Sequence, residues 1–85
     1  MESDVESPNG RRNTRVGSRK NLSAERVRHG MTQVMLADQL DVNPSTVVFW
    51  ESGRTTPSKK NLNALCSILD CSAPYLLKRF GVDDA

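Results

Sequence analysis

The feature that most limits how this chain folds is a three-residue connection between two helical patterns. The first pattern covers residues 33–40 and the second covers 44–52, so only residues 41–43 join them. A turn this short makes the two helices cross at a large angle. Val42 is the apolar residue of the turn, and we expect it to fill the angle between the helices. The crossing of these two segments is therefore the first element of the predicted fold.

Start and stop signals divide the rest of the chain into further short helices. Thr32 and Asn43 are typical N-cap residues, and a proline follows Asn43 in the first helical turn. Gly30 and Gly53 stand where a helix commonly ends in a left-handed residue. The expected helices cover residues 18–29, 33–40, 44–52, a segment after Ser58, and a segment after Ser72 that reaches toward Phe80. No segment indicates a β-strand, so the predicted fold is a compact all-α domain of five helices.

Apolar residues at helical spacing define the expected core. In the third helix, Val47 and Trp50 lie three residues apart and point to the same side as Val42. In the first helix, Leu22 and Val27 are expected to form the apolar side. The other helices contribute Leu36, Ala37 and Leu40, then Leu62, Leu65, Ile68 and Leu69, and finally Tyr75, Leu76 and Leu77. Together these stripes suffice for one small core.

Charge is distributed unevenly along a chain whose net charge is only +2. Residues 1–10 carry three acids and no base, whereas residues 11–20 carry five bases and no acid. The five bases are Arg11, Arg12, Arg15, Arg19 and Lys20. We expect residues 1–17 to be a flexible basic N-terminal arm that contacts phosphates, residues 18–80 to be the domain, and 81–85 to be a C-terminal tail. The alternative is a solvated tail without a partner.

Several classes of protein are excluded by what the sequence lacks. No apolar run is long enough for a membrane span, and the N-terminus has no apolar signal segment. Cys66 and Cys71 are expected to be free thiols, and with His29 they are too few for a zinc site. No catalytic triad and no glycine-rich phosphate loop is present. We therefore expect a cytoplasmic protein that is not an enzyme and needs no metal or cofactor.

The outward side of the third helix indicates a nucleic-acid partner. Ser45, Val48, Phe49 and Ser52 share a stripe opposite the core side, and half of that stripe is apolar. In a DNA major groove, Val48 and Phe49 could meet thymine methyl groups. The alternative is that Phe49 packs within the fold or against a second subunit. The expected base contacts are Pro44, Ser45, Thr46, Val48 and Phe49. Residues 44–52 contain no Arg, Lys, Gln or Asn, so discrimination should depend on methyl contacts and DNA shape.

Phosphate contacts are expected on both sides of this helix. Gln33 stands at the start of the second helix, where its amide and the helix N-terminus could meet a phosphate. Ser52, Arg54 and Lys59 flank the far side. The alternatives are a capping role for Gln33 and solvated loop charges for Arg54 and Lys59.

The residues described so far resemble the helix-turn-helix family of lambdoid phage repressors and Cro proteins. The resemblance covers about Asn21 to Lys78, and its C-terminal run from Asn61 is similar to the repressor domain of a temperate phage of enteric bacteria. The matching residues are Arg26, Gly30, Thr32, Gln33, Leu36, Ala37, Leu40, Val42, Val47, Trp50, Glu51, Gly53, Pro57, Leu65, Leu69, Tyr75, Leu76 and Leu77.

The resemblance implies a transcriptional repressor of phage type that binds a palindromic DNA operator as a homodimer. It implies Gln33 on a phosphate, base contacts from the five residues named above, and a structural ion pair between Arg26 and Glu51. The chain departs from the family in having Asp41 in place of a turn glycine and the apolar Val34 and Met35 at usually polar positions. Pro44 and Phe49 are not the usual base readers, so no operator sequence can be transferred.

Two other functions fit the same fold. Antitoxins and restriction-modification controllers carry a partner-binding extension, whereas only Gly81 to Ala85 follow the last helix here, which favours a Cro-like protein or a shortened repressor. A protein-interaction module would instead use Val34, Met35, Val48 and Phe49 as a docking patch. In either case the end of the last helix, with Leu77, Phe80 and Val82, is the expected dimer contact.

Overall fold

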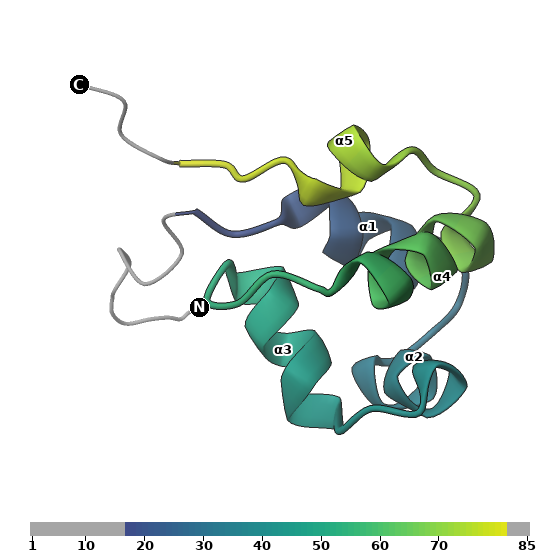
Figure 1. The fold of residues 1–85 in the computed structure, drawn as a ribbon. Coiled ribbons are helices and arrows are strands. Elements are labelled where there is room, and N and C mark those ends of the chain that lie inside the picture. The colour runs from purple at the N-terminus through teal and green to yellow at the C-terminus, as the bar shows by residue number, and fades with distance from the viewer. Residues whose placement is uncertain (1–16, 82–85) are drawn as a thin grey trace, which may run out of the picture.

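A computed structural model of the chain describes residues 17–81 (Figure 1). The predictions for residues 1–16 and 82–85, which include Arg11, Arg12, Arg15 and Val82, lie outside the described residues. The helices are α1 (Lys20–Arg28), α2 (Gln33–Leu40), α3 (Pro44–Ser52), α4 (Lys59–Leu69) and α5 (Ala73–Leu77). The prediction of a five-helix, all-α domain is therefore confirmed for the part of the chain that the structure describes.

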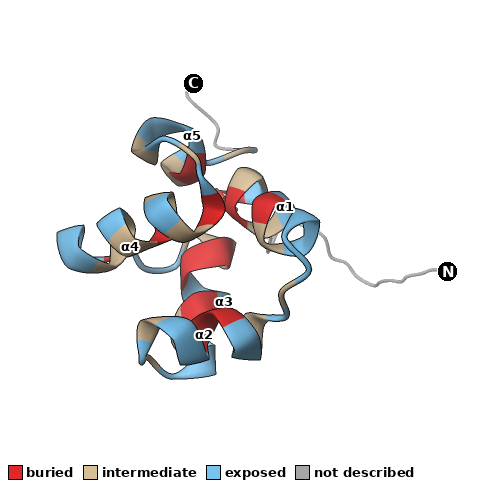
Figure 2. Cartoon of the chain, turned by 90° about the vertical axis from the view of Figure 1, so that its right-hand side faces the viewer, coloured by how far each residue is buried: buried red, intermediate tan, exposed pale blue. Residues whose placement is uncertain are grey.

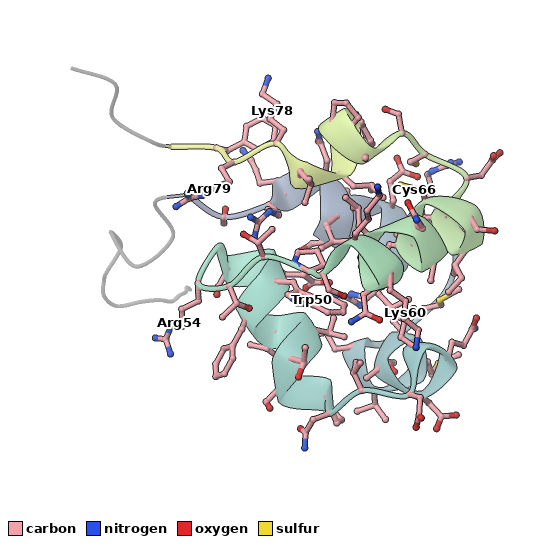
Figure 3. The ribbon with its side chains drawn as sticks, in the orientation of Figure 1. Trp50, Arg54, Lys60, Cys66, Lys78 and Arg79 are labelled. Atoms are coloured by element: carbon pink, nitrogen blue, oxygen red, sulfur yellow. The ribbon has the colours of Figure 1, made fainter. Side chains whose placement is uncertain are left out.

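The helices are arranged in two groups. Both views place α2 and α3 together below α1, α4 and α5 (Figures 1 and 2). α3 contacts α2 on one side and α1 on the other, while α5 packs on α1 and α4. Every helix contributes to the buried core, whose members are Leu22, Leu36, Ala37, Val47, Trp50, Leu65, Leu69 and Leu76. Trp50 lies near the centre, between α3 and α4 (Figure 3).

The turn between α2 and α3 is built as the sequence predicted. The Oγ1 atom of Thr32 accepts a hydrogen bond from the Met35 amide, and the Oδ1 atom of Asn43 accepts one from the Ser45 amide. Asp41 adopts the left-handed conformation with φ of 57°, which an aspartate tolerates better than most residues. Val42 packs half-buried against the core. The orientation of α3 is thus set by local signals on both sides of the turn.

Two expectations about the core and one about the last helix were wrong. Tyr75, expected in the apolar stripe of the last helix, is 41% exposed, and its hydroxyl donates to Glu25 of α1 instead. Val27 is 62% exposed, whereas Leu22 is buried; five residues advance a helix by about 500°, so these side chains point about 140° apart. Phe80 lies outside α5, which ends at Leu77 because Lys78 turns to an extended conformation. Instead, the Phe80 amide donates to the Ser18 carbonyl at 2.8 Å, in an isolated antiparallel bridge.

The bridge brings the start of the described chain against the end of α3. The Gly17 amide donates to the Phe80 carbonyl, and the Gly17 carbonyl accepts from Arg79 Nε at 3.0 Å. On its other side Gly17 meets Gly53, where an added Cβ would overlap the Gly17 carbonyl oxygen. Gly53 also has a φ of 85°. Both the conformation and the close approach therefore require glycine at this position.

The substitution Gly53→Ala is expected to destabilise the domain more than Gly30→Ala. Gly30 also has a positive φ, of 73°, but nothing would lie near a Cβ added there. Both substitutions carry the left-handed penalty of about 1–2 kcal/mol, and only Gly53→Ala also displaces Gly17. Urea unfolding of the two variants measures the difference, which we expect to be about 1 kcal/mol or more. Equal losses would show that Gly17 moves aside without cost.

Candidate nucleic-acid interface

The outward side of α3 is exposed as a continuous stripe. Val48 is 40% exposed and Phe49 is 37% exposed, although both are large apolar residues. Pro44 and Ser45 are also exposed, and Thr46 is half-buried. The opposite side of the helix is buried in the core through Val47 and Trp50, so α3 presents one side to the core and one to solvent.

Arg54 extends this exposed surface beyond the end of α3. Its guanidinium carbon lies 5.3 Å from the centre of the Phe49 ring, which is a cation–π geometry. The Arg54 amide donates to the Phe49 carbonyl at 2.9 Å, so the backbone supports the same arrangement. The Arg54 side chain projects away from the domain (Figure 3). The sequence suggested a charge near the helix end but not its stacking on Phe49, because the contact depends on how the chain turns at Gly53.

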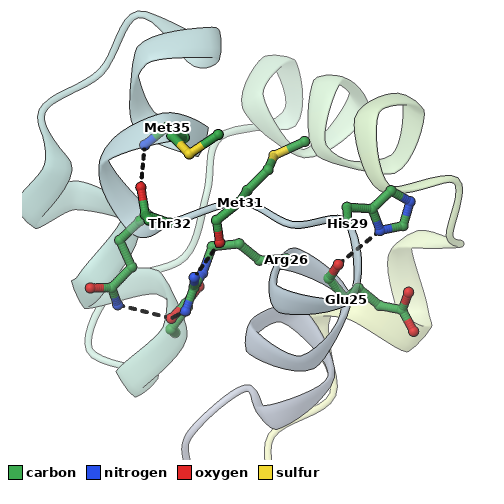
Figure 4. Close-up of polar contacts among 8 residues, drawn as sticks. Glu25, Arg26, His29, Met31, Thr32 and Met35 are labelled. Carbon is green, nitrogen blue, oxygen red and sulfur yellow. Dashed lines mark hydrogen bonds and ion pairs between the residues drawn. The ribbon is translucent and has the colours of Figure 1, made fainter.

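The inner end of α3 is held by a buried ion pair. Arg26 Nε lies 2.6 Å from Glu51 Oε2, and the two side chains are 13% and 8% exposed. Arg26 Nη1 also donates to the Met31 carbonyl, which Figure 4 shows in the loop between α1 and α2. Gln33 Nε2 donates to Glu51 Oε1 at 3.0 Å. The Glu51 carboxylate therefore joins α1 and the start of α2 to α3, and Glu51 lines the same groove as Val48.

The side chain of Gln33 has a partner within the domain that the sequence did not indicate. It lies at the first position of α2, and its side-chain amide nitrogen is held by Glu51. This nitrogen carries two hydrogens and Glu51 accepts one of them, so the second remains able to donate to a phosphate. The positive end of α2 adds to the attraction for a phosphate at this place.

The position of Arg19 differs from the one predicted for a residue of the basic arm. It is only 3% exposed, because its guanidinium turns inward at the C-terminal end of α3. Nη1 donates to the carbonyls of Trp50 and Thr55, and Nη2 donates to Thr56 Oγ1. Burial, and secondarily the charge of Arg79, lowers the pKa of Arg19. A side chain bound in this way cannot reach DNA, so the prediction of an arm contact by Arg19 is wrong.

Further basic side chains are exposed on α4, on α1 and after the end of α5. Lys59 and Lys60 lie exposed in the first turn of α4. Lys20 and Lys78 lie 5.0 and 4.9 Å from the centre of the Phe80 ring. A groove of about 680 Å³ separates the outer side of α1 from the Val48 side of α3. The exposed surface of α3 therefore continues onto α1.

A second carboxylate, Glu25, connects α1 to α5 away from the α3 stripe. Arg28 Nε donates to its Oε1 atom and the Tyr75 hydroxyl donates to its Oε2 atom. The hydrogen bond from Arg28 is the main cause that lowers the pKa of Glu25, and the bond to Glu25 raises the pKa of Tyr75. Cys66 and Cys71 are free and half-buried nearby.

The fold and the exposed stripe define a helix-turn-helix domain. Residues 22–76 match the helix-turn-helix family HTH_3, so the chain belongs to this family, whose members bind DNA as transcription regulators and are typically not enzymes. One relative is the HTH-type transcriptional regulator DicA of Escherichia coli (strain K12), 36% identical over 73 residues. The match covers 86% of this chain but 51% of DicA, so the chain spans about half the length of this relative.

The fold also matches a solved structure. The hypothetical transcription factor NHTF from Neisseria superposes with a TM-score of 0.59 at 27% sequence identity, covering 71% of this chain and 69% of that one. None of the helices within residues 17–81 combines the length and the apolar character needed to cross a lipid bilayer.

Proposed function

We propose that this chain binds double-stranded DNA sequence-specifically, with α3 in the major groove. The observation that carries the proposal is the exposed stripe of α3, where two large apolar side chains face solvent while the ion pair of Glu51 with Arg26 ties the helix to α1. An α-helix fits the width of the major groove, and apolar side chains there contact thymine methyl groups. The proposed base contacts are Pro44, Ser45, Thr46, Val48 and Phe49.

The proposal also includes phosphate contacts on both sides of the groove. Arg54 and Lys59 follow α3 in the chain and are exposed, while Ser52 and the start of α2 at Gln33 complete the proposed set. Lys20 and the arm residues Arg11, Arg12 and Arg15 are proposed as further contacts to the DNA backbone. The one carboxylate of α3, Glu51, is paired with Arg26 and so does not repel a phosphate as a free charge would.

The proposed role is that of a transcriptional repressor of phage or prophage type in the cytoplasm. The similarity to DicA, a transcriptional regulator, supports a regulatory role. As a repressor the chain would bind a palindromic operator as a homodimer, because two-fold symmetric sites match two-fold symmetric proteins. The proposed dimer contacts are Leu77, at the end of α5, and Phe80, in the segment after it, which are both half-buried.

Binding to duplex DNA is expected to weaken steeply with salt. Each neutralised phosphate contributes a slope of about −0.9 when the logarithm of the association constant is plotted against that of the salt concentration. The substitution Lys59→Ala should reduce the slope by about that amount. Fluorescence anisotropy titrations of a labelled duplex at several salt concentrations measure both quantities.

The control is Asp70→Asn, which changes the net charge by one at the end of α4 opposite to Lys59, and an asparagine tolerates the left-handed conformation of this residue. This variant should keep the slope of the unmodified chain. Binding that does not depend on salt would contradict the proposed function. A Phe49→Ala variant that keeps full DNA affinity but loses a protein partner would favour the protein-interaction module instead.

A further inference from the structure

We propose that α3 recognises the C5-methyl group of pyrimidines in the major groove and accepts 5-methylcytosine in place of thymine. The inference rests on the proposed function and specifies the kind of duplex that the same surface binds. Thymine and 5-methylcytosine both carry a methyl group at C5. They differ at position 4, where thymine has an acceptor oxygen and cytosine has an amino donor.

The first argument concerns the groups that could distinguish the two bases. A carboxylate would accept a bond from the cytosine amino group and so recognise cytosine. The only carboxylate of α3 is Glu51, and it is held inside the domain by Arg26 and Gln33. The helix also contains no Lys, Arg, Gln or Asn, so no strong donor on it selects for the thymine oxygen.

The hydroxyl groups at the start of α3 do not distinguish the bases either. A serine or threonine hydroxyl donates or accepts according to its partner. Ser45 Oγ donates to Asn43 Oδ1 at 2.9 Å, which leaves its lone pairs to accept from a cytosine amino group. Rotation of the hydroxyl frees its hydrogen for the thymine oxygen, and Asn43 Oδ1 then keeps its bond from the Ser45 amide. The Thr46 hydroxyl can likewise donate or accept. The polar part of the stripe is therefore indifferent at position 4.

The apolar part of the stripe is held in place for contact with a methyl group. The Arg54 guanidinium lies over the Phe49 ring at 5.3 Å from its centre, which limits rotation of the ring. Val48 precedes it on the same exposed side, and a β-branched side chain in a helix has one strongly preferred rotamer. Two apolar groups with little freedom can thus bury a methyl group without first becoming ordered.

The surrounding charge favours nucleic acid as the occupant of this surface. Arg54, Lys59 and Lys60 are exposed beyond the C-terminal end of α3, while Glu51 is paired within the domain. A protein partner with an apolar docking face would not require these cations. Duplex DNA supplies both the methyl groups and the phosphates, and it is the occupant to which we commit.

The experiment compares three randomised duplex libraries amplified from one template. The first contains thymine and cytosine, the second replaces thymine by uracil, and the third contains uracil and 5-methylcytosine. Burial of one methyl group raises the affinity about fourfold. A site selected from the first library should therefore bind about fourfold more weakly for each contacted thymine that is replaced by uracil. Selection should recover tightly bound sequences from the library with uracil and 5-methylcytosine, and none from the library with uracil and unmodified cytosine.

Variants of the chain test whether α3 is responsible. Val48→Ala and Phe49→Ala should each bring the thymine-to-uracil affinity ratio toward one, while salt-dependent binding persists. The matched control is Val34→Ala, because Val34 is also an exposed valine, 61% against 40% for Val48, but lies on α2. Its ratio should equal that of the unmodified chain. Circular dichroism establishes that each variant is folded.

The outcomes separate the inference from the proposed function. Equal affinity for thymine and uracil duplexes overturns methyl recognition but leaves DNA binding in place. Tight binding to thymine duplexes combined with weak binding to 5-methylcytosine duplexes, each with the sites selected from its own library, overturns the claim that α3 does not distinguish the groups at position 4. Absence of binding to every library overturns the proposed function itself.

Discussion

Replacing Glu51 by leucine is expected to lower the free energy of unfolding by about 3–5 kcal/mol, because it leaves the Arg26 guanidinium buried without a counter-ion. Both side chains of the pair are largely withdrawn from solvent, and Glu51 also accepts a bond from Gln33. The loss should therefore exceed that from any exposed ion pair. Urea unfolding followed by tryptophan fluorescence measures it, since Trp50 is adjacent in the chain and buried.

A double variant separates the missing charge from the missing contacts. In Arg26→Met/Glu51→Leu no charge remains unpaired, and buried ion pairs replaced by apolar residues are often neutral or stabilising. The double variant should therefore be more stable than Glu51→Leu alone. The matched control is Arg28→Gln, which breaks the Arg28–Glu25 pair in which the Arg28 side chain is 69% exposed, and it should change the stability little. If Glu51→Leu were as stable as Arg26→Met/Glu51→Leu, the unpaired charge of Arg26 would not be the cause of the loss.

Replacing Arg19 by methionine is the second large effect, a loss of about 2–4 kcal/mol. The substitution removes the guanidinium bonds to the carbonyls of Trp50 and Thr55. The Trp50 carbonyl keeps its bond from the Gly53 amide, but a hydrogen bond from a charged group contributes about 1.5–3 kcal/mol. Arg19 also places positive charge at the C-terminal end of α3, where it stabilises the helix dipole. Arg19→Lys should not restore stability, because an ammonium cannot span three acceptors on two sides as a guanidinium does.

The control for Arg19 is its neighbour Lys20, which is exposed. Lys20→Met removes the same charge from the same segment, so it should change DNA affinity more than stability. The two variants are compared by urea unfolding and by titration with duplex DNA. If Arg19→Met kept full stability and lost DNA affinity, Arg19 would be an arm residue after all.

Local signals in the sequence were sufficient for the helices and for the turn between α2 and α3. Thr32, Asn43 and Ser58 each accept the capping bond expected of them, because an N-cap bond spans only two or three residues. Asp41 takes the left-handed conformation for an equally local reason. The spacing of Val47 and Trp50 placed the buried side of α3, and with it the exposed stripe on the opposite side.

Contacts between segments far apart in the chain could not be predicted from such local signals. Arg19 belongs to a run of basic residues, yet its partners lie 31 to 37 positions further along the chain. Nothing in residues 11–20 distinguishes it from Arg15 or Lys20. Likewise, Phe80 continues an apolar pattern but pairs with Ser18. The pairing of Arg26 with Glu51 came from resemblance to a family, since spacing alone showed only two charges beside apolar stripes.

The sequence alone therefore determined the five helices, the tight turn and the side of α3 that faces outward, because caps and helical periodicity act within a few residues. Only the tertiary structure decided which charged side chains are buried and paired inside the domain. It turned Arg19 and Glu51 inward and left Arg54 stacked on Phe49. The reason is physical: whether a charged side chain is solvated or buried depends on the acceptors and donors that folding brings to it, and those come from other helices.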